Sequence, residues 1–84
     1  MLEHLAKSLM KLRREQRNLH CRIEAAKKRY ERAKYANSLA KMSDTELQKV
    51  RSLLEGIKML VISTDAEIAR TEAQIVASVL DCYR

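Results

Sequence analysis

Very few side chains in this sequence have the type and spacing that catalysis or metal binding requires. His20 and Cys21 are adjacent, and neighbouring helical residues point about 100° apart, which disfavours a nucleophile–base pair. His4 and His20 have no ligand spacing, and the chain lacks a Glu-x-x-His pair for a di-iron site. Its single glycine excludes a glycine-rich phosphate loop. We therefore predict no enzymatic activity, no catalytic, metal-binding or cofactor-binding residue, no cofactor and no small-molecule substrate.

The two cysteines and the apolar runs bear on the compartment. Cys21 and Cys82 are too few for a disulfide scaffold, and their spacing matches no zinc motif. This usage favours a reducing compartment. The longest aliphatic run, residues 59–62, is far too short for a membrane span, and the chain does not begin with an apolar signal core. We predict a cytoplasmic location and no transmembrane segment.

The charge of the chain is positive and unevenly distributed. Seventeen basic and eleven acidic residues give a net charge of +6, and residues 1–42 carry most of the basic excess. This charge permits an acidic protein, a nucleic acid or an anionic membrane surface as a partner. Only Tyr30 and Tyr35 are aromatic in the basic half, and no nucleic-acid recognition motif is present. Binding of nucleic acid or of an anionic membrane through the first helix is therefore the alternative prediction.

The elements that would position these side chains are long helices. The 84 residues include one glycine and no proline, phenylalanine or tryptophan, a composition typical of extended helix. In the middle of the chain, Ser43 and Glu46 form a capping-box pattern, and Met42 and Leu47 have the spacing of a hydrophobic staple. Asp44 adds negative charge at the positive end of the helix dipole. A helix is therefore expected to begin here.

On both sides of this cap, one set of residues recurs at alternating intervals of three and four, the spacing of a coiled coil. We call such a set a seam, the line of side chains expected to face the neighbouring helix. The first series, with only Gln16 and Asn37 polar, comprises Leu2, Leu5, Leu9, Leu12, Gln16, Leu19, Ile23, Ala26, Tyr30, Ala33, Asn37 and Ala40. The second series comprises Leu47, Val50, Leu54, Ile57, Val61, Thr64, Ile68, Thr71, Ile75, Ser78 and Cys82.

Two seams of matched length around a central cap predict an all-α fold, an antiparallel two-helix coiled-coil hairpin. We expect one domain over residues 1–84, with a helix over about 2–41, a turn at about 42–43 and a helix over about 44–82. A second capping-box pattern near Ile62–Asp65 could break the second helix, but the seam continues through it. A hairpin of this size buries little apolar surface, so we expect association into a four-helix bundle or a hetero-helical complex.

The two seams also predict a register. Gln16 falls opposite Thr71, a polar pair that could set the register, although Gln16 could instead lean out to solvent. Beside the seam, Arg13 faces Glu72. The predicted layers are Ala40–Leu47, Ala33–Leu54, Ala26–Val61, Leu19–Ile68 and Leu12–Ile75, with Arg22 facing Glu67 at the edge.

The half of the hairpin near the turn is left with surfaces for a partner. Ala36, Leu53 and Leu60 extend the apolar face beyond what one neighbouring helix can cover. We predict a non-enzymatic protein–protein interaction module: a small helical scaffold, adaptor or chaperone-like subunit of a larger assembly. Its partner would be a second copy, giving a homodimer, or another helical, acidic protein. The basic residues expected to lack internal partners and to attract it are Lys27, Lys34, Arg51 and Lys58.

Overall fold

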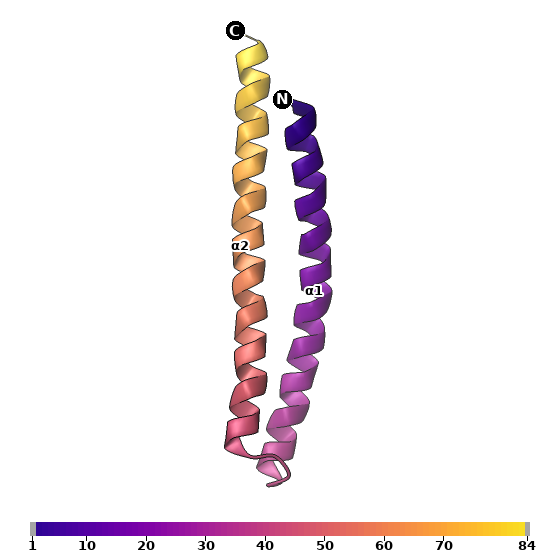
Figure 1. The fold of residues 1–84 in the computed structure, drawn as a ribbon, viewed down its shortest axis with the longest axis vertical. Coiled ribbons are helices and arrows are strands. Elements are labelled where there is room, and N and C mark those ends of the chain that lie inside the picture. Colours follow the sequence, from indigo (N-terminus) through magenta and orange to yellow (C-terminus); the bar gives the residue numbers. More distant parts are fainter. Residues whose placement is uncertain (1, 84) are drawn as a thin grey trace.

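The computed structural model describes residues 2–83, which form two long helices and the loop that joins them (Figure 1). Helix α1 spans Leu2–Ser38 and helix α2 spans Asp44–Cys82. The helices are antiparallel, so both ends of the chain lie at the same end of a rod with extents of 66 × 15 × 13 Å. The predicted all-α helical hairpin is confirmed.

The two helices face each other with the residues that the three–four spacing predicted. Leu19 and Ala33 are the buried residues of α1, and both belong to its seam. Most other seam positions are half-buried, and none of the described side chains is fully enclosed. The core is therefore a single layer of side chains between two helices. The buried residues of α2, all from its seam, are Val50, Leu54, Thr64 and Ile68.

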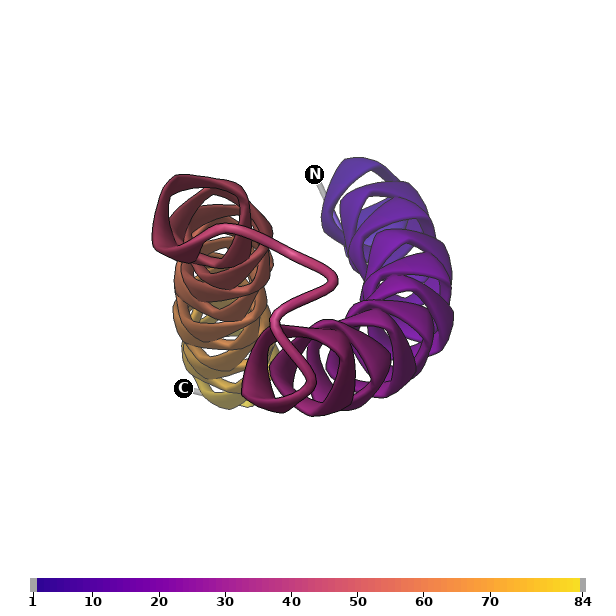
Figure 2. The same cartoon turned by 90° about the horizontal axis from the view of Figure 1, so that it is seen from below.

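The helices wind around each other rather than running straight. Figure 2 looks along the rod from the turn and shows α1 sweeping around α2. A hydrophobic repeat of seven residues imposes this coiling, because seven residues are slightly fewer than two turns of a straight helix. The strict repeat in the sequence thus determines the shape of the rod as well as its buried face.

Helix α1 ends earlier than expected, at Ser38 rather than near residue 41. Ala40 has a φ of 57°, in the left-handed region. Its N–H donates to Asn37 O at 3.0 Å, and the Lys41 N–H donates to Ala36 O at 2.9 Å. These two bonds form a Schellman motif, which normally has glycine at the left-handed position. Ala40 is consequently exposed in the loop, and the expected Ala40–Leu47 layer is wrong.

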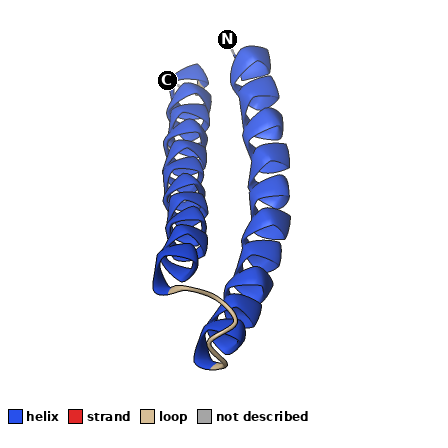
Figure 3. Cartoon of the chain, turned by 60° about the horizontal axis from the view of Figure 1, so that its bottom comes forward, coloured by secondary structure: helices blue, strands red, loops and turns tan. Residues whose placement is uncertain are grey.

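The loop of residues 39–43 (Figure 3) is held by side chains from both helices. The Asn37 Nδ2 group donates to Met42 O at 3.0 Å and to Asp44 Oδ1 at 2.9 Å. Ser43 is the N-cap of α2, and its hydroxyl accepts from the Glu46 N–H at 3.2 Å. The predicted cap is confirmed, and Asn37, a polar interruption of the seam, ties the end of α1 to the start of α2.

Helix α2 is continuous through the second capping-box pattern and through its one glycine. Residues 62–65 lie inside the helix, and Thr64 is buried in the seam. Gly56 is helical, and a Cβ atom at that position would meet no other atom within 4 Å. The uninterrupted seam therefore outweighs the second capping pattern and the glycine.

The register predicted for the terminal half is supported by one ion pair. The Arg13 Nη2 group donates to Glu72 Oε1 at 2.9 Å. The expected Arg22–Glu67 pair is not formed among the described residues. Among the described residues, the terminal half thus has one ion pair between the helices, and this pair is exposed and worth only a few tenths of a kcal/mol.

Gln16 and Thr71 do not hydrogen-bond to each other. The Gln16 Nε2 group donates to Asp65 Oδ1 at 2.8 Å, and the Thr71 hydroxyl donates to Glu67 O at 2.9 Å within its own helix. A carboxylate is a stronger acceptor than a hydroxyl, and a helical threonine readily bonds the carbonyl four residues earlier. Gln16 still joins the two helices, through a residue beside the seam rather than in it.

The left-handed alanine predicts that Ala40→Gly stabilises the fold. Relief of about 1–2 kcal/mol of steric cost exceeds the extra chain entropy of glycine, so the free energy of unfolding should rise by roughly 0.5–1 kcal/mol. Urea unfolding followed by circular dichroism, at one chain concentration, measures this change. Ala6→Gly in the exposed face of α1 is the matched control and should lose about 1 kcal/mol. A destabilised Ala40→Gly protein would contradict the strained loop.

The opposite substitution should stabilise α2. Gly56→Ala adds a methyl group into open space and removes a flexible residue from a helix interior, so the free energy of unfolding should rise by about 1 kcal/mol. The same urea titration measures it. If Gly56→Ala has no effect or destabilises the protein, the helix is not regular at this position.

Candidate protein-binding groove

The hairpin has a groove where the seam of α1 changes from leucine to alanine. Two adjoining hollows, of about 320 and 590 Å³, share Ala25, Arg29 and Val50 in their lining. Ala26 lines the first hollow and Ala33 lines the second. Small side chains on α1 leave this space because they do not extend far enough to cover the larger residues of α2. The small size of the α1 seam residues therefore produces a hollow that is open to solvent.

The floor and one rim of this groove are apolar. Val50 is buried and Leu53 is 56% exposed, so the groove passes from the core to an unprotected leucine. Ala36, half-buried, lines the larger hollow, and Leu53 lines the smaller one. Leu60 is 49% exposed and lies outside both linings. The structure thus brings Ala36 and Leu53 of the predicted apolar edge to one groove, while Leu60 extends the apolar surface along α2.

The cationic groups of the groove are three arginines of α1. Arg22 and Arg29 line the smaller hollow, and Arg29 and Arg32 line the larger one. All three are exposed, and none takes part in an ion pair among residues 2–83. These arginines are not among the site residues predicted from the sequence. The available signal was the seven-residue spacing of Arg22, Arg29 and Ala36, which places the three on one edge of the helix.

Three of the four predicted basic residues have acidic partners in their own helix. Lys27, Lys34 and Lys58 each lie 3.6–3.9 Å from a glutamate three residues earlier in the same helix. The expectation that these lysines lack internal partners is therefore wrong, because pairs at this spacing form on the surface of one helix. The Lys34 ammonium also lies 5.5 Å from the centre of the Tyr30 ring.

The heptad positions of these lysines place them on the other edge of the hairpin. Lys27, Lys34, Arg51 and Lys58 flank the seam on the side away from Ala36 and Leu53. Arg51 has no ion pair among the described residues. The cations next to the apolar groove are consequently arginines, whose planar guanidinium groups bind carboxylates through two parallel hydrogen bonds.

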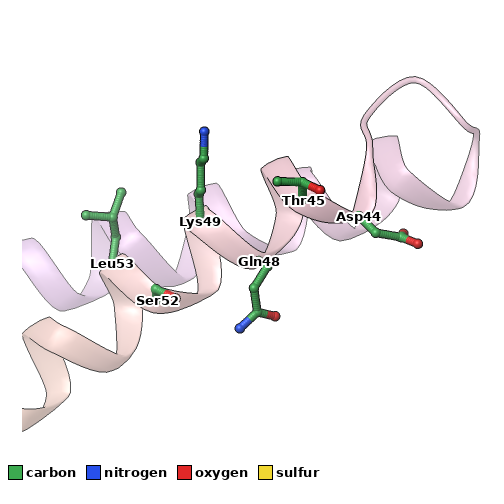
Figure 4. Close-up of a pocket in the computed structure, with 6 residues that line it drawn as sticks. All are labelled: Asp44, Thr45, Gln48, Lys49, Ser52 and Leu53. Carbon is green, nitrogen blue, oxygen red and sulfur yellow. The ribbon is translucent and has the colours of Figure 1, made fainter.

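A further hollow near the start of α2, of about 800 Å³, is lined by one helix alone. Its lining runs from Asp44 to Leu53. Figure 4 shows the side chains diverging, with Lys49 and Leu53 pointing to one side and Gln48 to another. Side chains that diverge from a single convex surface cannot enclose a ligand. We therefore assign no site to it.

Cys21 and Cys82 are free and exposed. Among residues 2–83, no three histidine, cysteine, aspartate or glutamate side chains are grouped so that they could hold a metal ion. The arrangement that the structure does provide is an apolar groove bordered by guanidinium groups, which suits the binding of another polypeptide.

Neither helix contains, within the described residues, an apolar stretch long enough to cross a membrane. Comparison of the chain with protein-family models, with curated proteins and with solved structures gave no match. The functional interpretation therefore rests on the surfaces of the chain itself.

Proposed function

We propose that this chain is a non-enzymatic protein–protein interaction module, a small adaptor or chaperone-like subunit that binds an amphipathic helix of an acidic partner protein. The observation that carries the proposal is the groove itself, in which exposed Leu53 and the alanines of α1 adjoin three arginines that have no ion-pair partner within residues 2–83. Exposed apolar surface rimmed by polar groups is typical of sites where proteins bind one another.

A helix is the occupant that fits the shape of the groove. The groove follows two antiparallel helices, and a third helix packs into such a depression with anchors at intervals of three, four and seven residues. Arg22 and Ala36 are fourteen residues apart, so the groove is roughly 21 Å long, or about four helical turns. The spacing of Arg22 and Arg29 matches two carboxylates seven residues apart on the partner.

The apolar content of the groove favours a protein over the alternative partners. A nucleic acid or an anionic membrane would be held by the charges of α1 alone, whereas Ala36, Leu53 and Leu60 would contribute nothing to phosphate binding. The exposed cysteines are compatible with a reducing environment, which supports a cytoplasmic location as part of the proposal.

The proposal is tested with a labelled, designed peptide of about 18 residues that has leucines at intervals of three and four and glutamates beside them. Fluorescence anisotropy should show binding to the native chain that persists in about 0.5 M salt, because burial of apolar surface drives it. Leu53→Glu with Leu60→Glu should abolish binding while circular dichroism remains that of a helical hairpin, since both leucines are exposed.

Matched variants separate the groove from general charge. Arg22→Glu with Arg29→Glu should weaken peptide binding at least tenfold, whereas Lys27→Glu with Lys34→Glu, on the other edge, should change it by less than threefold. A peptide with lysine in place of each glutamate should not bind. Equal loss in both pairs of variants, or preferential binding of a duplex DNA of 20 base pairs that disappears in 0.5 M salt, would instead assign α1 to anionic ligands.

A further inference from the structure

Helix α2 has a second apolar stripe, separate from the seam and from the groove. Its large members are Met59, Ile62, Val76 and Leu80, followed by Tyr83 at the C-cap, and each is 57–86% exposed. Most exposed apolar residues on a protein are scattered, and a run that occupies a single helical face requires an explanation.

Three alanines complete the stripe between these large residues. Ala66, Ala69 and Ala73 are exposed, and with the five large residues they give successive intervals of 3, 4, 3, 4, 3, 4 and 3. No charged residue interrupts the series. This is the spacing of a coiled-coil seam, sustained for about three and a half heptads and roughly 37 Å of helix.

The stripe lies on the outward side of α2. Its residues occupy the heptad positions opposite those that pack against α1, so α1 cannot cover them. The corresponding outward face of α1 is mainly polar: Lys7, Arg14, Arg17 and Lys28 are exposed there, together with Glu3, Glu24 and Glu31. Its large exposed apolar residues, Met10 and Tyr35, are 25 positions apart and form no stripe. The hairpin therefore has one hydrophilic, basic outer face and one apolar outer face.

We propose that the stripe is the interface with a second copy of this chain, in which the two α2 helices pack side by side and parallel. This inference goes beyond the proposed function, because it concerns a different surface. A two-fold interface between identical stripes covers both at once. It also places the basic α1 faces on the outside of the assembly, as far from each other as the four helices allow, which limits their repulsion.

The charges beside the stripe favour the parallel arrangement. Asp65 and Arg70 flank it on opposite sides, and neither has an ion-pair partner among residues 2–83. Asp65 accepts a hydrogen bond from Gln16 through Oδ1, which leaves Oδ2 for a second partner. In a parallel pair, a residue at Asp65's position lies beside the residue five positions later on the other helix. Asp65 of each copy would thus meet Arg70 of the other, twice in the dimer. An antiparallel pair centred on the stripe would instead bring Arg70 close to Arg70.

The size profile of the stripe is compatible with two close helices. Alanine at 66, 69 and 73 forms a narrow middle section in which the backbones can approach, and larger side chains fill the layers at both ends. Because none of the described side chains within one hairpin is fully enclosed, this added layer would give the four-helix assembly its more deeply buried apolar core.

Light scattering of the purified chain tests the proposal. The native chain should have twice its 9.7 kDa mass at micromolar concentration. Ile62→Glu with Leu80→Glu should give the monomer mass with helicity retained, because both residues are exposed in the hairpin. Leu53→Glu with Leu60→Glu is the matched control and should remain dimeric while losing the groove's peptide. The stripe variants can therefore lose dimerisation and keep peptide binding, whereas the groove variants can lose peptide binding and keep dimerisation.

A cysteine variant tests the orientation. In a background with Cys21→Ser and Cys82→Ser, Ile62→Cys should form a disulfide-linked dimer under mild oxidation, because a parallel pair places residue 62 opposite itself. An antiparallel pair would separate these residues by roughly 27 Å. The proposal is overturned if the native chain is monomeric, or if the dimer survives the Ile62→Glu and Leu80→Glu changes. It is also overturned if the Leu53→Glu and Leu60→Glu control becomes monomeric, or if the Ile62→Cys dimer forms no disulfide.

Discussion

Two helices can share only one layer of side chains, and this constraint governs the rest of the molecule. Every buried residue of the hairpin lies in that layer, from Leu19 to Ile68, and none of the described side chains is fully enclosed. Apolar residues outside the layer are not covered by any other part of residues 2–83. The exposed groups at Leu53 and along the outward side of α2 are therefore consequences of the architecture, and they are the surfaces on which partners can act.

The same layer produces the groove because the α1 side chains in it change from large to small along the helix. Where α1 presents Leu19, the two helices fill the space between them. Where it presents Ala26 and Ala33, the side chains are too short to do so, and hollows open beside Val50. Arginines of the adjacent heptad position border this gap. A local loss of packing within the chain is thus coupled to a surface that can gain packing from another helix.

The features that could be predicted from sequence are those specified by local or periodic patterns. The seams, the Ser43 cap and the Arg13–Glu72 bridge follow from spacing alone. The end of α1 could not be predicted from spacing, because Ala40 adopts a left-handed conformation that in most helices is occupied by glycine. The choice of Asp65 by Gln16 depends on side-chain rotamers, which periodicity does not specify. The lysine pairs were missed although their glutamates are visible three residues earlier.

The outward stripe of α2 depends on a structural fact that the sequence left open. Its intervals can be read directly, yet they describe one face only if the helix is continuous past Ser63. Given that continuity, the stripe and the groove occupy different parts of the rod. A parallel pair of hairpins would carry its two turns, and hence its two grooves, at the same end. A partner with two acidic helices could then bind both grooves, and the second contact would benefit from a high effective concentration. Dimerisation would in this way raise the affinity for a partner whose single helix would bind one shallow groove only weakly.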